Sequence, residues 1–454
     1  MLGCSISISS KLSYPKMSLY PSLTMSLLSF SFLLLFAFSA KAVVPPSETF
    51  RFVNEGEFGP FIVEYGADYR VISITNAPFQ LAFYNTTPNA FTLALRMATT
   101  RSESLFRWVR EAKEEPVGEH TFSLGTDGNL VLADADGRIA WQSNTANKGV
   151  VGFQLLPNGN MVLHDSNGKF IWQSFDHPTD TILVGQSLRA GGETKLVTRA
   201  SAQNNVNGAY SLVMETKQLV LQYKGMNSPK PLVYFKSSVW PRTQDGTLQT
   251  VTLNVEETND GFAYDVLLDY TVANSSIGTG NLILTRPKYN STLSILRLGI
   301  DGNLRVFTYY DKVDSQAWEE TFTLFSRDSI WGNECELPER CGNFGLCEEN
   351  QCVACPSLKG LLGWSQNCQP KKVNCRPNDF SYYKLEGVNH FMSQYNEGEG
   401  IKESNCGRKC TSDCKCLGYF YHRETSKCWI ANELKTLAKT SNSSHVGYIK
   451  APNK

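Results

Sequence analysis

The clearest pattern of apolar and polar residues in this chain is a unit that occurs twice, at residues 122–143 and at residues 153–174. The two copies align with each other without insertions or deletions. In the first copy, apolar and polar residues alternate as in a short strand, and the Asp127-Gly128 pair then favours a tight turn. Two further apolar runs follow, at 130–132 and 139–141, with a second Asp-Gly pair between them. The unit therefore predicts short antiparallel strands joined by hairpin turns.

A weaker copy of the same unit lies far downstream, where Leu298–Leu304 repeats the pattern of Leu124–Leu130. Long amphipathic helical patterns are absent from this part of the sequence, and short strand-like runs occupy the region between the copies: 210–214, 219–223, 262–268, 282–285 and 305–310. We therefore expect a mostly β protein with a second, diverged domain of the same type as the first.

The N-terminal segment has the pattern of a secretory signal peptide. Leu27–Ala40 is strongly apolar, Lys11 and Lys16 precede it, and Ala40-Lys41-Ala42 fits a cleavage site between small residues. A transmembrane anchor is the alternative, but the run is shorter than the roughly 20 residues that span a bilayer. Translation from Met17 or Met25 stays open. No second run of this length follows, which predicts a soluble secreted protein without a membrane span.

Four Asn-x-Ser/Thr sequons fit the same compartment, because secreted proteins are glycosylated at such sites. They begin at Asn85, Asn274, Asn290 and Asn442. Together with the leader, they predict a glycoprotein.

The cysteines are distributed very unevenly. Of 13 in the chain, Cys4 lies in the leader and no other occurs before Cys335. The rest form two groups of six: Cys335, Cys341, Cys347, Cys352, Cys355 and Cys368, then Cys375, Cys406, Cys410, Cys414, Cys416 and Cys428. Exported thiols oxidise, so disulfides are favoured over a redox pair or a zinc site at Cys352-x-x-Cys355. We expect no metal and no cofactor; spacing alone leaves about 15 pairings open in each group of six.

Charge and length limit the function classes. The 454 residues suffice for about three domains. The 43 Lys and Arg residues balance 43 Asp and Glu residues, and only 19% of residues are charged. A nucleic-acid-binding protein would need clustered basic residues, so that class is excluded.

Several motifs resemble those of known plant families. The repeated Asp/Asn-Gly-Asn-x-Val-Leu unit followed by Trp-Gln-Ser resembles the bulb-type, mannose-binding lectin domain, which folds as a β-prism of three four-stranded sheets. Trp172–Thr181 resembles a hallmark of S-locus glycoproteins and S-domain receptors, and Phe83–Leu95 and Asn227–Leu232 resemble segments of secreted EP1-like glycoproteins. The resemblance implies tandem β-prism domains followed by disulfide-rich EGF-like and PAN/apple modules.

On this resemblance we expect five segments: a signal peptide at 1–42, a bulb-type lectin domain at 43–178, a second lectin-like domain at 179–330, an EGF-like module at 331–371 and a PAN/apple module at 372–454. The resemblance also implies six disulfides: Cys335–Cys347, Cys341–Cys352, Cys355–Cys368, Cys375–Cys414, Cys406–Cys428 and Cys410–Cys416. Small modules with thin cores need such links, each of which stabilises by about 2–5 kcal/mol.

The lectin resemblance also implies candidate sugar-binding residues. In bulb-type lectins the site reads Gln-x-Asp-x-Asn-x-Val-x-Tyr, and strand alternation places these side chains on one face. The matching residues are Asp127, Asn129 and Val131 in the first copy and Asn158, Asn160 and Val162 in the second.

No copy of this motif is complete. Gly125 and Ala133 replace Gln and Tyr in the first copy, and Leu156 and His164 replace them in the second. In the downstream copy Asp301 and Asn303 remain, whereas Gly299, Arg305 and Phe307 replace Gln, Val and Tyr. One interpretation is that Asp/Asn-Gly-Asn persists as turn chemistry. The other is weak or altered glycan binding, for which the Asp127 copy is the least changed.

Catalytic motifs are absent from the sequence, so we expect no enzyme. The favoured function is that of a secreted, lectin-like plant glycoprotein of the cell wall or apoplast that binds mannose-type glycans or glycoproteins. The alternative is a protein-interaction scaffold in which the sugar sites are vestigial and the EGF-like and PAN modules bind an extracellular protein. A homo-oligomer is compatible with either.

Overall fold

The computed structural model describes residues 43–54, 69–87, 90–97, 105–107, 120–134, 136–202, 204–237, 246–255, 262–271, 277–287, 292–310 and 317–453. The expected signal peptide, Cys4, Asn274 and Asn290 lie outside the described residues. The described part is mostly β, as predicted, and its strands form eight sheets. None of its helices is long and apolar enough to span a bilayer.

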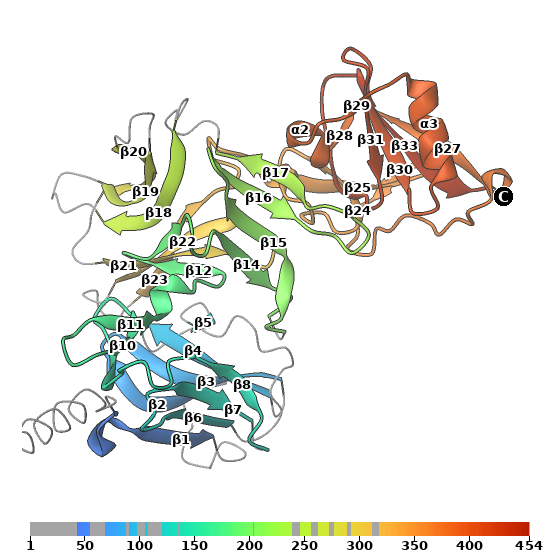
Figure 1. The fold of residues 1–454 in the computed structure, drawn as a ribbon. Coiled ribbons are helices and arrows are strands. Elements are labelled where there is room, and N and C mark those ends of the chain that lie inside the picture. Colours follow the sequence, from blue (N-terminus) through green and yellow to red (C-terminus); the bar gives the residue numbers. More distant parts are fainter. Residues whose placement is uncertain are drawn as a thin grey trace, which may run out of the picture.

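The first two copies of the repeated unit lie in a set of three sheets (Figure 1). The sheets are, in spatial order, β2 (Tyr69–Asn76), β3 (Phe79–Thr87), β4 (Ala90–Met97) and β5 (Leu105–Arg107); β1 (Phe50–Asn54), β6 (His120–Leu124), β7 (Leu130–Ala133) and β8 (Ile139–Gln142); and β11 (Phe170–Gln173), β10 (Met161–His164) and β9 (Gly152–Leu155). Inward-facing residues such as Phe122, Leu130 and Leu163 form their common core. This first prism is the expected lectin-type body.

A second prism follows directly in the chain and contains three four-stranded sheets. They are β14 (Lys195–Arg199), β15 (Asn207–Met214), β16 (Leu219–Tyr223) and β17 (Leu232–Lys236); β13 (Ser187–Arg189), β18 (Thr247–Val255), β19 (Phe262–Thr271) and β20 (Ile277–Pro287); and β12 (Thr181–Leu183), β21 (Thr292–Leu298), β22 (Leu304–Tyr310) and β23 (Ala317–Thr323). The weak downstream copy of the unit forms β21 and β22. The fold of this copy thus confirms the expected tandem arrangement.

The sheet β12–β21–β22–β23 of the second prism faces the first prism. Strand alternation sends Leu296 and Val306 into the core of the second prism. The neighbouring Ile295, Phe307 and Tyr309 point to the opposite face and pack into the core of the first prism. Both faces of this sheet are therefore apolar, and the two prisms share an interface built by side chains.

The cysteine-rich modules form two five-stranded sheets at the C-terminal end of the molecule (Figure 1). One contains β26 (Gly360–Gly363), β25 (Gln351–Ser357), β24 (Phe344–Glu348), β32 (Lys435–Lys439) and β28 (Val388–His390); the other contains β27 (Phe380–Glu386), β33 (His445–Pro452), β30 (Gly418–His422), β31 (Lys427–Ala431) and β29 (Glu399–Gly400). The helices among the described residues are α2 (Met392–Tyr395) and α3 (Glu403–Ser412), with 3-10 turns at Pro46–Glu48, Ser174–Asp176, Glu334–Glu336 and Pro377–Asp379. Because β24 pairs in parallel with β32, the first sheet extends across the expected boundary at residue 371.

Six disulfides hold these modules together, and all twelve cysteines from Cys335 onward are used. The pairs are Cys335–Cys347, Cys341–Cys352, Cys355–Cys368, Cys375–Cys414, Cys406–Cys428 and Cys410–Cys416. They are the same pairs that the family resemblance implies. Among the described residues no group of three His, Cys, Asp or Glu side chains has the arrangement of a metal site.

Candidate functional site

In the first unit, the turn between β6 and β7 is held by its own side chains. The Asp127 carboxylate accepts a hydrogen bond from the backbone N–H of Asn129 at 3.0 Å. Asn129 is only 8% exposed and donates its Nδ2 to Gln142 Oε1 at 2.8 Å. Its Oδ1 accepts from the Ser143 hydroxyl at 3.2 Å and from the Thr145 backbone at 3.1 Å. Asn129 thus links the β6–β7 turn to the end of β8.

The second unit repeats this network. The Asn158 side chain accepts from the backbone of Asn160, and Asn160 Nδ2 donates to Gln173 Oε1 at 2.9 Å. Asn160 Oδ1 accepts from the Ser174 hydroxyl at 3.1 Å and from the Phe175 backbone at 3.2 Å. The Trp-Gln-Ser segment of each repeat therefore supplies the partners of the Asn in the Asp/Asn-Gly-Asn turn.

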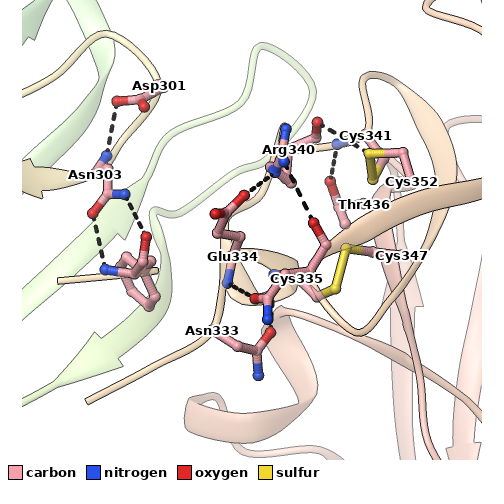
Figure 2. A network of polar contacts seen from close by, with 12 residues as sticks. Asp301, Asn303, Asn333, Glu334, Cys335, Arg340, Cys341, Cys347, Cys352 and Thr436 are labelled. Carbon is pink, nitrogen blue, oxygen red and sulfur yellow. Dashed lines mark hydrogen bonds and ion pairs between the residues drawn. A yellow bond between two sulfur atoms is a disulfide. The ribbon is translucent and has the colours of Figure 1, made fainter. Parts of the chain in front are cut away.

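The downstream unit keeps the turn, in which the Asp301 carboxylate accepts from the Asn303 backbone (Figure 2). Here, however, an arginine pairs with the acidic side chain. Asn303 Nδ2 donates to the Phe325 carbonyl at 2.8 Å, and Asn303 Oδ1 accepts from the Phe325 backbone at 3.1 Å. Arg305 forms two hydrogen bonds with the Asp301 carboxylate, at 2.9 and 2.6 Å. Burial acts to raise the pKa of Asp301, but the bonds and charge of Arg305 outweigh it and hold the pKa below its ordinary value. Both oxygens of the Asp301 carboxylate are therefore hydrogen-bonded to Arg305.

Exposure differs just as clearly among the units. Val162 is completely buried, so the second unit offers no apolar contact to a ligand at this position. Phe307 of the downstream unit packs against the first prism. In the first unit, by contrast, Asp127 is exposed and Val131 and Ala133 are partly exposed. The outer face of β6 and β7 is thus the accessible one.

From the sequence, turn chemistry is the favoured interpretation of these Asn residues, and a sugar ligand is the alternative. The structure brings Asp127, Asn129 and Val131 together at one end of a sheet and does the same for Asn158 and Asn160. The residues that it missed are the partners Gln142 and Gln173, although the repeated Trp-Gln-Ser could have indicated them because the repeats share it.

Polar contacts also fasten the second prism to the C-terminal modules. Tyr210 donates to Glu339 at 2.8 Å and Tyr223 donates to Glu433 at 2.9 Å. Burial, together with Glu339, raises the pKa of Tyr210 well above its ordinary value, so the phenol stays a donor. The Asn396 amide forms two hydrogen bonds with the backbone of Val233, at 3.0 and 2.8 Å. These residues are far apart in sequence, and no local pattern predicts their contacts.

The first disulfide-rich segment, which contains Cys335–Cys347 and Cys341–Cys352, is held by disulfides and hydrogen bonds together (Figure 2). Cys341 donates its backbone N–H to the Thr436 hydroxyl at 2.9 Å, which links the module to β32. An ion pair joins Arg340 to Glu334 at 2.6 Å. These contacts connect the segment internally and to β32.

Comparison with known proteins agrees with this architecture. Residues 106–204 match the D-mannose binding lectin family, and residues 264–363 match the S-locus glycoprotein domain. Together, the two matches and the prisms define a lectin-domain glycoprotein.

The relatives narrow this class to one family. EP1-like glycoprotein 3 from Arabidopsis thaliana is 51% identical over 424 residues, which cover 92% of this chain and 95% of that protein. The epidermis-specific secreted glycoprotein EP1 from Daucus carota is 56% identical over 363 residues, covering 76% of this chain and 93% of that protein. The chain therefore belongs to the EP1-like glycoprotein family.

Kinase relatives are more distant. A G-type lectin S-receptor-like serine/threonine-protein kinase from Arabidopsis thaliana is 24% identical, and the match covers 74% of this chain but only 38% of the kinase. The EP1-like family is one of secreted glycoproteins with lectin domains and is not enzymatic. The chain is accordingly a secreted, lectin-like glycoprotein.

Proposed function

We propose that this protein binds carbohydrate in the plant cell wall or apoplast through the outer face of β6 and β7. The observation that supports this most is the exposed Asp127 carboxylate beside the partly exposed Val131. Asp127 accepts a single hydrogen bond, from Asn129, within the described part, so it keeps acceptor capacity for sugar hydroxyls. Mannose-type glycans, free or on glycoproteins, are the ligands that the lectin family implies.

The proposal restricts binding to one unit of three. A sugar ring needs both hydroxyl partners and an apolar contact, and the second unit buries its valine. The downstream unit pairs its Asp301 with Arg305. The first unit lacks the Gln and Tyr of the full motif, so we expect weak binding to mannose, because each missing hydrogen bond to a sugar hydroxyl lowers affinity.

A glycan array with the purified, enzymatically deglycosylated full chain tests this function. Asp127→Ala is expected to lower binding at least tenfold, whereas Asn158→Ala, the equivalent change in the second unit, is expected to leave it unchanged. Binding to no glycan on the array, or equal binding by wild type and Asp127→Ala, would contradict the proposal.

A second candidate function is binding of an extracellular protein by the C-terminal modules. The β25–β26 hairpin exposes Leu358, Leu361 and Leu362 by 49%, 58% and 56%. A cavity of about 360 Å³ lies beside it, lined by Leu358, Leu361, Leu385, Val388 and others. Because β26 is the edge strand of its sheet, an extended apolar segment of a partner protein fits this place by adding a strand.

The two functions are separable in the full chain. Pull-down from an extracellular extract should recover a partner that Leu361→Asp loses and Asp127→Ala retains. Sedimentation of the purified chain distinguishes a second copy from a foreign partner. If Leu361→Asp captures the same proteins as the wild type, the hairpin is not the docking site.

A further inference from the structure

The pairing of β1 with β6 places a residue outside the lectin motif on the same outer face as Asp127. Arg51 lies directly opposite Ser123, Ser123 lies opposite Val131, and Val131 lies opposite Gln142. These four residues form one row across β1, β6, β7 and β8, and strand alternation turns their side chains to the same side. The β1 end of this row is the cationic residue Arg51.

The Arg51 guanidinium is available at this face. Its side chain is exposed, and it forms no ion pair or side-chain hydrogen bond with the described residues. The inward-facing neighbours Phe50 and Phe52 pack into the core and fix the strand that carries it. The guanidinium therefore has a rigid base, and its planar set of donors is unused by the described residues.

The missing Gln of the motif leaves this part of the face open. Gly125 follows Ser123 by two residues and so belongs to the same face, one step beyond the row. A Cβ at Gly125 would lie 3.0 Å from the Asp127 carboxylate, so any side chain there would cover the acid. Because residue 125 is glycine, it has no side chain in the space between Asp127 and the row of residues that begins at Arg51.

The opposite end of the row supplies a further donor. Gln142 is partly exposed, and its Oε1 accepts from Asn129, which orients the amide so that Nε2 remains a donor. Acceptor chemistry at Asp127, an apolar surface at Val131, and donors at Arg51 and Gln142 thus lie on one side of the sheet. Arg51 and Gln142 stand three strand spacings, roughly 14 Å, apart at the two ends of the row. A neutral hexose makes no special use of the cation, whereas a sugar carboxylate pairs with guanidinium bidentately.

We propose that this face prefers an acidic sugar, a uronic acid residue within a wall glycan, over neutral mannose. This inference rests on the proposed carbohydrate function and names the ligand class of the same site. Arg51 binds the carboxylate, Asp127 accepts hydroxyls of the ring, and Val131 contacts its C–H face. The formal net charge of the whole chain is zero, so the preference comes from this local cation and not from a general field.

Calorimetric titration of the full chain with a galacturonic acid oligosaccharide tests this, with the methyl-esterified oligosaccharide and a neutral mannose oligosaccharide as matched ligands. We expect the acid form to bind at least tenfold more tightly than either neutral ligand and to weaken as salt rises. Arg51→Gln should remove that preference, and Arg51→Lys should restore only part of it. Arg327→Gln, which removes the same charge from an exposed position outside the first prism, should change nothing.

The outcomes distinguish this inference from the function on which it rests. If the neutral mannose oligosaccharide binds as well as the acidic one and Arg51→Gln has no effect, the preference is wrong and carbohydrate binding stands. If neither ligand binds, carbohydrate binding at this face fails together with the inference. Thermal melting of each variant separates loss of binding from loss of folding.

Discussion

At the scale of single residues, the turn asparagines contribute to folding more than to a ligand. Asn160 is 4% exposed and makes three side-chain hydrogen bonds, two of them to Gln173 and the Phe175 backbone. Asn158, two residues earlier, is exposed and accepts one bond from the backbone. The same amide side chain is therefore expected to contribute more to stability at position 160 than at position 158.

The first prediction compares these two positions. Asn160→Ala should lower the free energy of unfolding of the first prism by about 2–3 kcal/mol, because it leaves the buried Phe175 N–H and the part-buried Gln173 Oε1 without the bonds that Asn160 supplies. Asn158→Ala should lower it by less than about 1 kcal/mol, since its turn is open to water. Urea denaturation followed by tryptophan fluorescence measures both. Equal losses would show that the network is not the cause.

The buried His390 gives a second prediction at this scale. Its Nδ1 accepts from the Met392 backbone and its Nε2 donates to the Glu433 carbonyl, both at 3.2 Å. One accepting and one donating nitrogen correspond to the neutral imidazole. Burial lowers its pKa from 6.5 to about 4, only partly offset by the bond to Glu433. Below pH 6.5 the unfolded chain takes up a proton that the folded chain does not, so stability falls until about pH 4.

The loss should amount to about 3 kcal/mol between these limits. His390→Gln, which keeps an acceptor and a donor, should flatten this part of the stability–pH profile. His177→Gln removes an exposed imidazole and serves as the control. Chemical denaturation between pH 4 and 7 measures the slope, and an unchanged slope in His390→Gln would contradict the assignment.

At the scale of elements, helix α3 depends on contacts from outside itself. A helix of 10 residues is marginal alone, and α3 lacks a side-chain N-cap. Cys406 and Cys410 anchor one face through their disulfides. Lys450 in β33 is 4% exposed and donates its Nζ to the carbonyls of Cys410 and Asp413, at 2.7 and 3.0 Å. A cation thus meets the negative end of the helix dipole.

The third prediction follows from this cap. Lys450→Met keeps the aliphatic length but removes both bonds, so the C-terminal module that contains α3 and β33 should lose about 1–3 kcal/mol of stability. Amide hydrogen exchange should rise in α3, especially in its last turn. Lys409→Met, which breaks an exposed ion pair with Glu399, should cost less than about 1 kcal/mol. Exchange rates in α3 that match the wild type would show that the disulfides alone hold the helix.

At the scale of the whole molecule, the packing between the prisms is tight at one glycine. Gly159 has φ +84°, and a Cβ there would lie 2.8 Å from Leu183 of the second prism and 2.8 Å from Phe79 of the first. Gly168 has a similar φ of +78° and open space around it. Substituting each of these two glycines in turn therefore distinguishes the free-energy cost of a left-handed backbone from that of a steric contact.

The fourth prediction uses this pair. Gly168→Ala should cost about 1 kcal/mol, from the left-handed backbone alone. Gly159→Ala should cost about 1–3 kcal/mol more, because Leu183 and Phe79 must move apart. Differential scanning calorimetry measures both, and limited proteolysis between the prisms should accelerate only in Gly159→Ala. Equal melting temperatures for the two variants would contradict close packing at this point.

Much of this molecule was predictable from local sequence. The alternation around Phe122 and Leu130 and the Asp-Gly turn between them determine a hairpin wherever the unit occurs, since side-chain period and turn chemistry are local properties. The same holds for the cysteine-rich segment, whose need for cross-links follows from its small cores. The pairing of those cysteines came from the family resemblance, because spacing leaves it open.

Only the tertiary structure decided which repeat keeps a usable face. Val131 and Val162 occupy the same position of the same motif, yet one is partly exposed and the other fully buried, because exposure depends on what packs against each sheet. Arg51 lies outside the repeat and reaches the face of Asp127 through the pairing of β1 with β6. A repeated sequence specifies repeated strands, whereas a binding surface requires that nothing else in the fold covers them.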